Sequence, residues 1–379
     1  MKEPVAIQPD TEFLKRLVEN GGGDLKKCYQ CATCSVVCDM AGDELAFPRR
    51  QMIAAQWGLK DRLMEDPAPW LCFYCGECSK RCPREANPGE SMMAIRRYLT
   101  TAYDWTGLSR LMYGSALWEI GVLALVSALV VLAFVLPSGF GFGLLSRHPE
   151  ALNAVMLDHF APKDVVHTAD RILAGVLSLL LLSNALRMFR YLTRNRQIPL
   201  GRYITLLPEL VMEGVFQRRW RKCADTAARF NWARHFVLVT GYVTIFSLVV
   251  LFLPTFQVED NTFHWTSLLG YYSTAVLVGS SISILADRKT KRSPMHRFSH
   301  LSDWLFPILL LLTAVTGILL NVVRLANLAM PTYIIYTVHL AIAVPMLVVE
   351  VPFGKWAHLL YRPLAIYVAA AISESDGSH

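Results

Sequence analysis

The chain has 379 residues, of which 54% are hydrophobic and only 18% are charged, and its mean hydropathy is +0.35. Soluble domains seldom reach this balance, so the composition argues against an ordinary soluble protein and predicts a membrane protein. The net charge of +7 is explained by an asymmetry between loops, described below, and does not indicate nucleic-acid binding.

The two ends of the chain are suited to different solvents. No uncharged run of membrane-spanning length occurs before about Tyr113, and several follow it. The first residues, MKEPVAIQPDTEFLKRL, carry charges where a signal peptide needs an apolar core. We therefore expect a mainly α protein with two domains. Residues 1–105 would form a helical, ferredoxin-like dicluster domain in the cytoplasm, and residues 106–379 a transmembrane bundle of about six spans.

Eight of the nine cysteines fall into two runs with the same spacing, Cys-x2-Cys-x2-Cys-x3-Cys. The first run is CYQCATCSVVC at 28–38, and the second is CFYCGECSKRCP at 72–83. Cytoplasmic thiols are kept reduced, so this spacing indicates metal rather than disulfides. Three closely spaced cysteines wrap one corner of an iron–sulfur cluster, and in two-cluster ferredoxins the fourth cysteine of a run that ends in Pro ligates the other cluster. Cys82-Pro83 has this ending.

We therefore predict two [4Fe–4S] clusters with crossed fourth ligands. The alternative is a pair of zinc sites, which usually consist of two cysteine pairs separated by a longer gap, and the repeated triplets favour iron–sulfur. Cys223 stands alone in a basic loop and is expected to have no metal role. The predicted ligands are Cys28, Cys31, Cys34 and Cys82 for the first cluster, and Cys72, Cys75, Cys78 and Cys38 for the second.

Six segments after Gly114 have close to the roughly 20 residues that cross the hydrocarbon core as a helix. The expected spans are 114–136, 171–189, 235–253, 266–286, 303–323 and 333–352.

The connecting loops differ strongly in charge. Residues 187–234 hold eleven Arg or Lys and residues 287–302 hold five, whereas residues 254–265 hold none and residues 137–170 hold two. The positive-inside rule places the first two loops in the cytoplasm. Six spans then return the C-terminus to the side of the clusters. We expect a multi-pass protein of the cell inner membrane, with its N-terminal domain and its C-terminus in the cytoplasm.

Histidines inside apolar spans are costly and usually functional. His339 lies near the outer start of the last expected span, and His358 lies at its inner end, 19 residues later. This separation is roughly 28 Å of helix, close to the thickness of the hydrocarbon core. The spacing therefore predicts one helix that holds a haem ligand at each membrane face.

A haem b with two imidazole ligands needs a second histidine from another helix. His235, at the inner start of the third span, is level with His358, so we predict that this pair holds an inner haem, with His300 as a competitor of His235. A lone interfacial histidine could instead be an ordinary polar residue at the headgroup level.

An outer haem would need a partner for His339. The expected partner is His167, at the outer start of the second span, in preference to His159 and His264.

Glu350 lies on the last span, eight residues before His358. A carboxylate at that depth indicates a proton path or a quinone contact, so Glu350 is the candidate catalytic residue. The alternative is a helix-end carboxylate that pairs with Lys355. Arg234 and Lys355, which lie close to the predicted ligands, could pair with haem propionates.

The two parts resemble two known families. The first 105 residues resemble the iron–sulfur subunit of heterodisulfide reductase. The remainder resembles the membrane cytochrome b of the respiratory nitrate reductase gamma type, in which two histidines on the last span bind separate haems. The segment VPFGKWAHL resembles the Pro-Phe-x-Lys-x-x-His ending of that group. Their fusion in one chain resembles the C-type members of quinone-interacting membrane-bound oxidoreductase (Qmo) complexes.

The resemblance implies an electron-transfer protein with two [4Fe–4S] clusters and one or two haems b. It also implies menaquinone as the membrane substrate, flavin-containing partners of the heterodisulfide-reductase-A-like type, and a link to adenylylsulfate reductase. Membrane lipid is a further partner, and nucleic acid is not expected. The alternatives are a redox module linked to heterodisulfide or sulfite reduction, and a transporter with a zinc-stabilised domain, which haem absorbance would exclude.

The chain departs from these families at two points. The nitrate reductase type has a second histidine on the helix that matches the third span, where this chain has Ile245. No adjacent cysteines occur, so the Cys-Cys-Gly domain of heterodisulfide chemistry is missing. We therefore expect that the chain does not reduce a disulfide itself.

Overall fold

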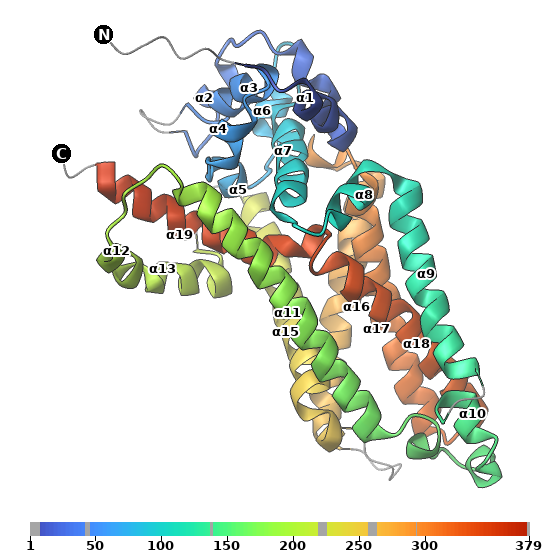
Figure 1. Cartoon of the computed structure of the whole chain (residues 1–379). Coiled ribbons are helices and arrows are strands. Elements are labelled where there is room, and N and C mark those ends of the chain that lie inside the picture. Colours follow the sequence, from blue (N-terminus) through green and yellow to red (C-terminus); the bar gives the residue numbers. More distant parts are fainter. Residues whose placement is uncertain are drawn as a thin grey trace.

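A computed structural model describes residues 8–41, 46–136, 139–218, 226–256, 264–292 and 294–376. Cys223 and His379 lie outside these residues. The described chain is mainly helical and contains no strand, as the sequence predicts. Figure 1 shows a cluster of short helices at one end and a bundle of long helices that extends away from it.

The N-terminal part is built around α7 (Pro88–Tyr103), which begins at a proline in its first turn. A proline is favoured there because its missing N–H would have no partner in a first turn. Met92, Ile95 and Leu99 of α7 are fully buried, and Phe13 packs edge-on against Tyr98. The shorter elements around it are α1 (Thr11–Leu17), η1 (Val18–Gly22), η2 (Gly23–Lys27), α2 (Thr33–Val36), α3 (Arg49–Gln56), α4 (Lys60–Met64), α5 (Ala68–Leu71) and α6 (Glu77–Lys80).

Six helices of the described chain are long and apolar enough to cross a membrane, as predicted. Many of their leucines are exposed, such as Leu129 on α9 and Leu179 on α11, which is expected where lipid is the solvent. The helices are α9 (Ala116–Val135), α11 (Lys163–Thr193), α15 (Thr226–Phe256), α16 (Thr266–Thr290), α17 (Leu301–Leu325) and α18 (Ala329–Glu350).

Short elements connect the long helices. Each of these elements has seven residues or fewer. They are α8 (Leu108–Gly114), α10 (Gly141–Leu145), η3 (Pro149–Leu152), η4 (Leu157–His159), α12 (Leu200–Thr205), α13 (Leu207–Val211), η5 (Met212–Phe216), η6 (Pro294–His296) and η7 (Lys355–Ala357).

The last predicted span is not one continuous helix, so the expectation that a single helix carries both His339 and His358 is wrong. The helix α18 ends at Glu350, and His358 is the first residue of a separate helix, α19 (His358–Asp376). Gly354 allows the break, because a Cβ at this position would lie 2.3 Å from Oε2 of Glu350. In Figure 1, α19 turns away from α18 and runs beside the N-terminal helices.

The N-terminal part is docked on one end of the bundle. The ring of Tyr361 on α19 packs against Trp70 and Tyr103 at centroid distances of 5.3 and 5.6 Å. Arg97 of α7 forms buried ion pairs with Glu90, at 2.8 Å, and with Asp303 of α17, at 3.3 Å. The predicted boundary after residue 105 falls between α7 and α8, but one apolar core continues from α7 into α11 and α19.

Candidate functional site

The two cysteine runs adopt the same local backbone. Gln30 and Ala32 of the first run have positive φ angles of 61° and 68°, and Tyr74 and Gly76 occupy the equivalent positions of the second run with 54° and 84°. Such left-handed residues reverse the chain between successive cysteines, so that their thiols can converge. Each loop leads into a one-turn helix, and these helices, α2 and α6, pack against each other.

The thiols gather in two sets. Burial raises the pKa of Cys34 to about 11, and three neighbouring thiols add to the shift. These neighbours are Cys28, Cys31 and Cys82. The fourth cysteine of the first run therefore lies elsewhere, and the last cysteine of the second run takes its place.

The second set contains the fourth cysteine of the first run. Burial raises the pKa of Cys38 to about 11, and the thiols of Cys72 and Cys75 add to the shift. The pKa of Cys78 is also raised, first by burial and then by Cys72, Cys75 and Cys38, ahead of Cys34. The structure thus brings together the two sets of four that the sequence assigns to separate clusters, and this supports the crossed ligation.

The spacing of the thiols fits a cluster better than a single ion. In a tetrahedral zinc site with Zn–S bonds of about 2.3 Å, the sulfur atoms lie about 3.8 Å apart. All eight cysteines of the two runs are described, and no three of their Sγ atoms lie within 4.8 Å of one another. The wider spacing leaves room for several irons between the thiolates, so these residues fit [4Fe–4S] clusters.

Backbone N–H groups point at some of these sulfurs. The N–H of Tyr74 lies 3.3 Å from Sγ of Cys72, and the N–H of Ala86 lies 3.4 Å from Sγ of Cys82. Hydrogen bonds of this kind stabilise the charged thiolate and help to set the potential of a bound cluster.

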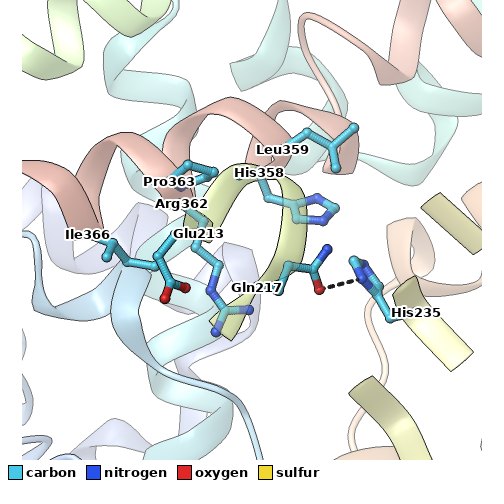
Figure 2. A pocket seen from close by; sticks show the side chains of 9 residues that line it. Glu213, Gln217, His235, His358, Leu359, Arg362, Pro363 and Ile366 are labelled. Carbon is cyan, nitrogen blue, oxygen red and sulfur yellow. Dashed lines mark hydrogen bonds between the residues drawn. The ribbon is translucent and has the colours of Figure 1, made fainter. Parts of the chain in front are cut away.

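His235 and His358 are also brought together. Their ring centroids lie 6.2 Å apart with an angle of 55° between the rings, and both line one pocket (Figure 2). With metal–imidazole bonds of about 2.0–2.1 Å, two axial imidazoles of one iron have centroids about 6.4 Å apart. The pocket itself is small, about 50 Å³, so the fit to a haem iron rests on the ring geometry and not on a preformed slot for the macrocycle.

The contacts of the two rings suit metal ligands. Nδ1 of His358 contacts the carbonyl of Lys355, and Nδ1 of His235 lies 2.9 Å from Oε1 of Gln217. A histidine that donates its Nδ1–H to an oxygen is held in the tautomer that ligates through Nε2. Burial lowers the pKa of His358 to about 4, so the ring is neutral at pH 7, as a ligand must be.

His300 does not share this pocket. It is the N-cap residue of α17, where its side chain accepts a hydrogen bond from the N–H of Ser302. Gln217 was not singled out from the sequence. It has a positive φ of 51° immediately after η5, and only the fold brings this segment to His235.

His339 lines a separate cavity of about 310 Å³ between α11, α15, α16, α17 and α18. Its Nδ1 lies 2.9 Å from the hydroxyl of Thr316, which donates its proton to the carbonyl of Leu312. Gly317 lies against the imidazole, because a Cβ there would be 3.3 Å from Cε1 of His339.

The structure does not bring His167 to the ring of His339. Nε2 of His167 lies 3.2 Å from the carbonyl of Val250. Val166, Val250 and Ile245 are among the residues that line the cavity, whereas His167 is not. The two alternative partners lie elsewhere: His264 contacts the hydroxyl of Thr266, and His159 packs against His148.

Glu350 is 1% exposed. Its Oε2 accepts a hydrogen bond of 3.0 Å from the backbone N–H of Lys355, and its Oε1 is buried without a hydrogen-bond partner in the described chain. The ammonium group of Lys355 pairs with Asp303 instead. The carboxylate of Glu350 is therefore not the partner of that lysine side chain.

A direct contact joins the second cysteine loop to the histidine pocket. Arg362 lines the pocket, and its guanidinium lies over the ring of Phe73, 5.0 Å from the ring centroid. Phe73 follows Cys72 in the sequence. Arg96 holds the start of the same loop by donating hydrogen bonds to the carbonyl of Cys72 and to the carbonyls of Pro69 and Trp70, which precede it. Neither Arg362 nor Phe73 was predicted, because only the fold places α19 beside this loop.

Comparisons with known proteins match the N-terminal part. Residues 24–86 match the 4Fe-4S dicluster domain family. A protein of Archaeoglobus profundus that is similar to the C component of heterodisulfide reductase is 36% identical over 104 residues, which are 26% of this chain and 55% of that protein. The C component of the H(2):CoB-CoM heterodisulfide,ferredoxin reductase of Methanothermobacter thermautotrophicus is 42% identical over 77 residues, 20% of this chain and 41% of that protein.

The chain spans about half the length of the curated relatives that it matches. No solved structure matches it. The dicluster match covers both cysteine runs, and the fold around them is helical. The N-terminal part of this chain therefore contains a 4Fe–4S dicluster domain.

Proposed function

We propose that this chain is the membrane electron-transfer component of a complex, and that it passes electrons between menaquinol and cytoplasmic partners that contain flavin. The observation that carries the proposal is the contact between Phe73, beside Cys72, and Arg362, in the pocket of His235 and His358. In this proposal, the residues that would hold an iron–sulfur cluster and those that would hold a haem lie on either side of this single side-chain contact.

The residues around these sites supply ligation, spacing and electrostatics. When bound, the clusters and haem b supply reversible one-electron carriers, and the protein sets their positions and potentials. His235 and His358 would ligate the inner haem. Arg234 pairs with Asp287 and Lys355 pairs with Asp303. We propose Arg362 for a propionate because it lines the pocket of the two histidines and because a guanidinium can bind a carboxylate with two parallel hydrogen bonds.

The cavity of His339 is our candidate for a second haem. The two sites differ in an informative way, because the inner site offers two histidines in a small pocket and the outer site offers a large cavity with His339 on its wall. His167 would complete the outer site if it left the carbonyl of Val250. A chain with one haem that is unaffected by His339→Ala would exclude this site.

We propose that Glu350 takes up a proton from the quinol. A buried carboxylate oxygen without a hydrogen-bond partner is unfavourable unless a donor reaches it, and a quinol hydroxyl is such a donor. Because the backbone N–H of Lys355 holds the other oxygen, the group is already oriented.

In this proposal the clusters face the cytoplasm, because the basic loops mark that side of the inner membrane. The fusion of a dicluster domain to a membrane bundle supports a role like that of the C-type member of Qmo complexes, with flavin-containing partners of the heterodisulfide-reductase-A-like type and a link to adenylylsulfate reductase. The relatives named as components of heterodisulfide reductases favour a second candidate, a membrane module linked to heterodisulfide or sulfite reduction.

A reduction experiment on the purified full-length chain tests the proposal. A menaquinol analogue should reduce both the haem, seen by absorbance, and the clusters, seen by electron paramagnetic resonance. In His358→Ala the quinol should no longer reduce the clusters, whereas dithionite, a small soluble reductant, still should. Clusters that the quinol reduces equally well in His358→Ala would contradict the proposed route.

A further inference from the structure

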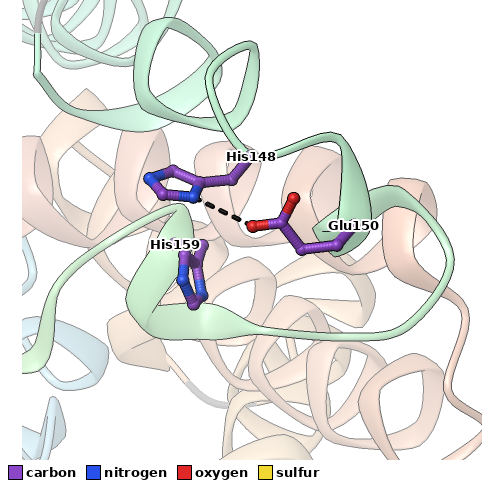
Figure 3. Close-up of side chains that lie close together, drawn as sticks. All are labelled: His148, Glu150 and His159. Carbon is purple, nitrogen blue, oxygen red and sulfur yellow. Dashed lines mark hydrogen bonds and ion pairs between the residues drawn. The ribbon is translucent and has the colours of Figure 1, made fainter.

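Three side chains that could bind metal lie close together between α9 and α11, at the end of the bundle away from the dicluster domain (Figures 1 and 3). They are His148, Glu150 and His159, and their ligand atoms all lie within 4.8 Å of one another. They take no part in the proposed electron route. No other such group of three or more potential metal ligands is found among the residues that the structure describes.

The contacts within the group leave a ligand position open. Nδ1 of His148 lies 3.0 Å from Oε1 of Glu150, and the rings of His148 and His159 meet edge to face, with centroids 4.5 Å apart. Nδ1 of His159 is buried, and no hydrogen-bond partner for it is found in the described chain. A buried polar nitrogen without a partner is unfavourable, and a bound cation would remove that penalty.

The backbone that carries these residues is held firmly. The hydroxyl of Tyr333 donates a hydrogen bond of 2.9 Å to the carbonyl of Ala151 and accepts one of 3.0 Å from the N–H of Met156. Phe160, which follows His159, is fully buried and stacks on Tyr333 at 4.7 Å. The segments η3 and η4 are thus fixed against α18, so the three ligands are positioned before any metal arrives.

The donor set indicates the class of metal. Two imidazoles and one carboxylate form a three-ligand set that zinc uses with a fourth position left for water. Magnesium and calcium prefer oxygen ligands throughout, so they suit this set poorly. We propose that His148, Glu150 and His159 bind one divalent transition metal of the zinc type, which ties η3 to η4.

The site has a structural consequence for the neighbouring cavity. Leu157 lies in η4, two residues before His159, and lines the cavity of His339. A metal that fixes η4 therefore also fixes this part of the cavity wall. The proposed metal site does not depend on the proposed electron transfer, so each of the two can be tested without the other.

Zinc binding to the full-length protein in detergent tests the site. After treatment with EDTA and removal of the chelator, the protein should bind one Zn²⁺ per chain. X-ray absorption at the zinc edge should show only nitrogen and oxygen neighbours, at about 2.0–2.2 Å. His148→Ala and Glu150→Gln change residues that are at least partly exposed, so the fold should persist. Each substitution should weaken zinc binding by a factor of about 10 to 100 or more. Losses of about this size follow the removal of a residue that only contacts a metal ligand, so the loss of a ligand itself should cost at least as much.

His264→Ala is the matched control, because this histidine precedes α16 at the same end of the bundle but contacts Thr266 instead. It should bind zinc as the unchanged chain does, and the iron content of all variants should stay the same. Sulfur neighbours at about 2.3 Å would place the zinc at cysteines and overturn the proposal. So would an unchanged zinc affinity in His148→Ala and Glu150→Gln.

Discussion

At the scale of single residues, the contact between Arg362 and Phe73 links the two candidate redox sites. The guanidinium lies 5.0 Å from the ring centroid and at the same time borders the pocket of His235 and His358. A cation that lies beside a bound haem would stabilise the reduced iron, which carries one more electron. A guanidinium over an aromatic ring also holds the loop of Cys72 against α19.

Two replacements of Arg362 should therefore separate the effect of its charge on the haem potential from the effect of its packing against Phe73. In Arg362→Ala the haem should remain, because its two histidine ligands are unchanged, but its midpoint potential should fall because a positive charge is lost. In Arg362→Lys the charge and the potential should be largely kept, whereas electron exchange with the cluster should slow because the stacking on Phe73 is weakened. Redox titration and stopped-flow absorbance measure the two effects. Identical potentials in all three proteins would show that Arg362 does not face the haem.

The crossed cysteines allow a second test at this scale. The structure puts Cys82 with the thiols of the first run, so Cys82→Ser should perturb the cluster of Cys28, Cys31 and Cys34. Cys38→Ser is the matched control and should perturb the other cluster. Electron paramagnetic resonance of the reduced protein distinguishes the two signals. Damage in Cys82→Ser that is confined to the cluster of Cys72, Cys75 and Cys78 would mean that each run ligates its own cluster.

At the scale of elements, the turn between α18 and α19 determines where His358 lies. The turn contains Pro352 and Gly354, which are both residues that interrupt helices. Gly354 lies against the carboxylate and Cα of Glu350, so no side chain fits there without a shift of the backbone. The turn directs α19 along the dicluster domain and brings His358 opposite His235.

Gly354→Ala should therefore displace His358 and lower the haem content, because its Cβ would lie 2.3 Å from Oε2 of Glu350. Gly214→Ala is the matched control. Gly214 borders the same histidine pocket, but an added Cβ would meet only Pro363, at 3.9 Å. Haem per chain, measured from the absorbance of the reduced pyridine complex, should fall in the first variant and stay constant in the second. Full haem content in Gly354→Ala would argue against this role of the turn.

How far the sequence predicts these elements depends on how local each signal is. The six spans follow from hydropathy within each segment, so all six were predicted, although α11 begins at Lys163, earlier than expected. The break after Glu350 was missed because the histidine spacing favoured one long helix over the Pro and Gly signals. His235 and His300 both begin spans, and only the packing of α15 and η5 beside α19 shows which one meets His358.

The difference between local and long-range signals also applies to the residues of the candidate sites. The gathering of the eight cysteines into two sets could be predicted because three cysteines of each set lie within seven consecutive residues. Gln217, Phe73 and Arg362 could not, because their roles arise from contacts between segments far apart in the sequence. The group of His148, Glu150 and His159 depends on the folding of a loop that has no regular periodicity.

At the scale of the whole molecule, a docked interface fixes the dicluster domain to the bundle. Arg97 of α7 pairs with Asp303 of α17 across it, and Tyr361 packs against Trp70 and Tyr103. The interface carries the second cysteine loop to the histidine pocket. It also means that the clusters and the basic loops should lie on the same side of the membrane.

A reporter fused after His379 tests this orientation. With six spans and the basic loops in the cytoplasm, a reporter that requires the cytoplasm should be active and one that requires the outside should be silent. A fusion after residue 261, between the third and fourth spans, is the opposite control. Activity of the C-terminal fusion only outside the cytoplasm would rule out either the span count or the orientation.

The most direct test of the central claim is the content of iron and haem per chain in the purified protein and in His358→Ala. We expect about eight non-haem irons, as two [4Fe–4S] clusters require, together with haem b in the unchanged chain. His358→Ala should keep the non-haem iron and lose the inner haem. Zinc in place of iron at the cysteines, or haem content that does not change in His358→Ala, would contradict it.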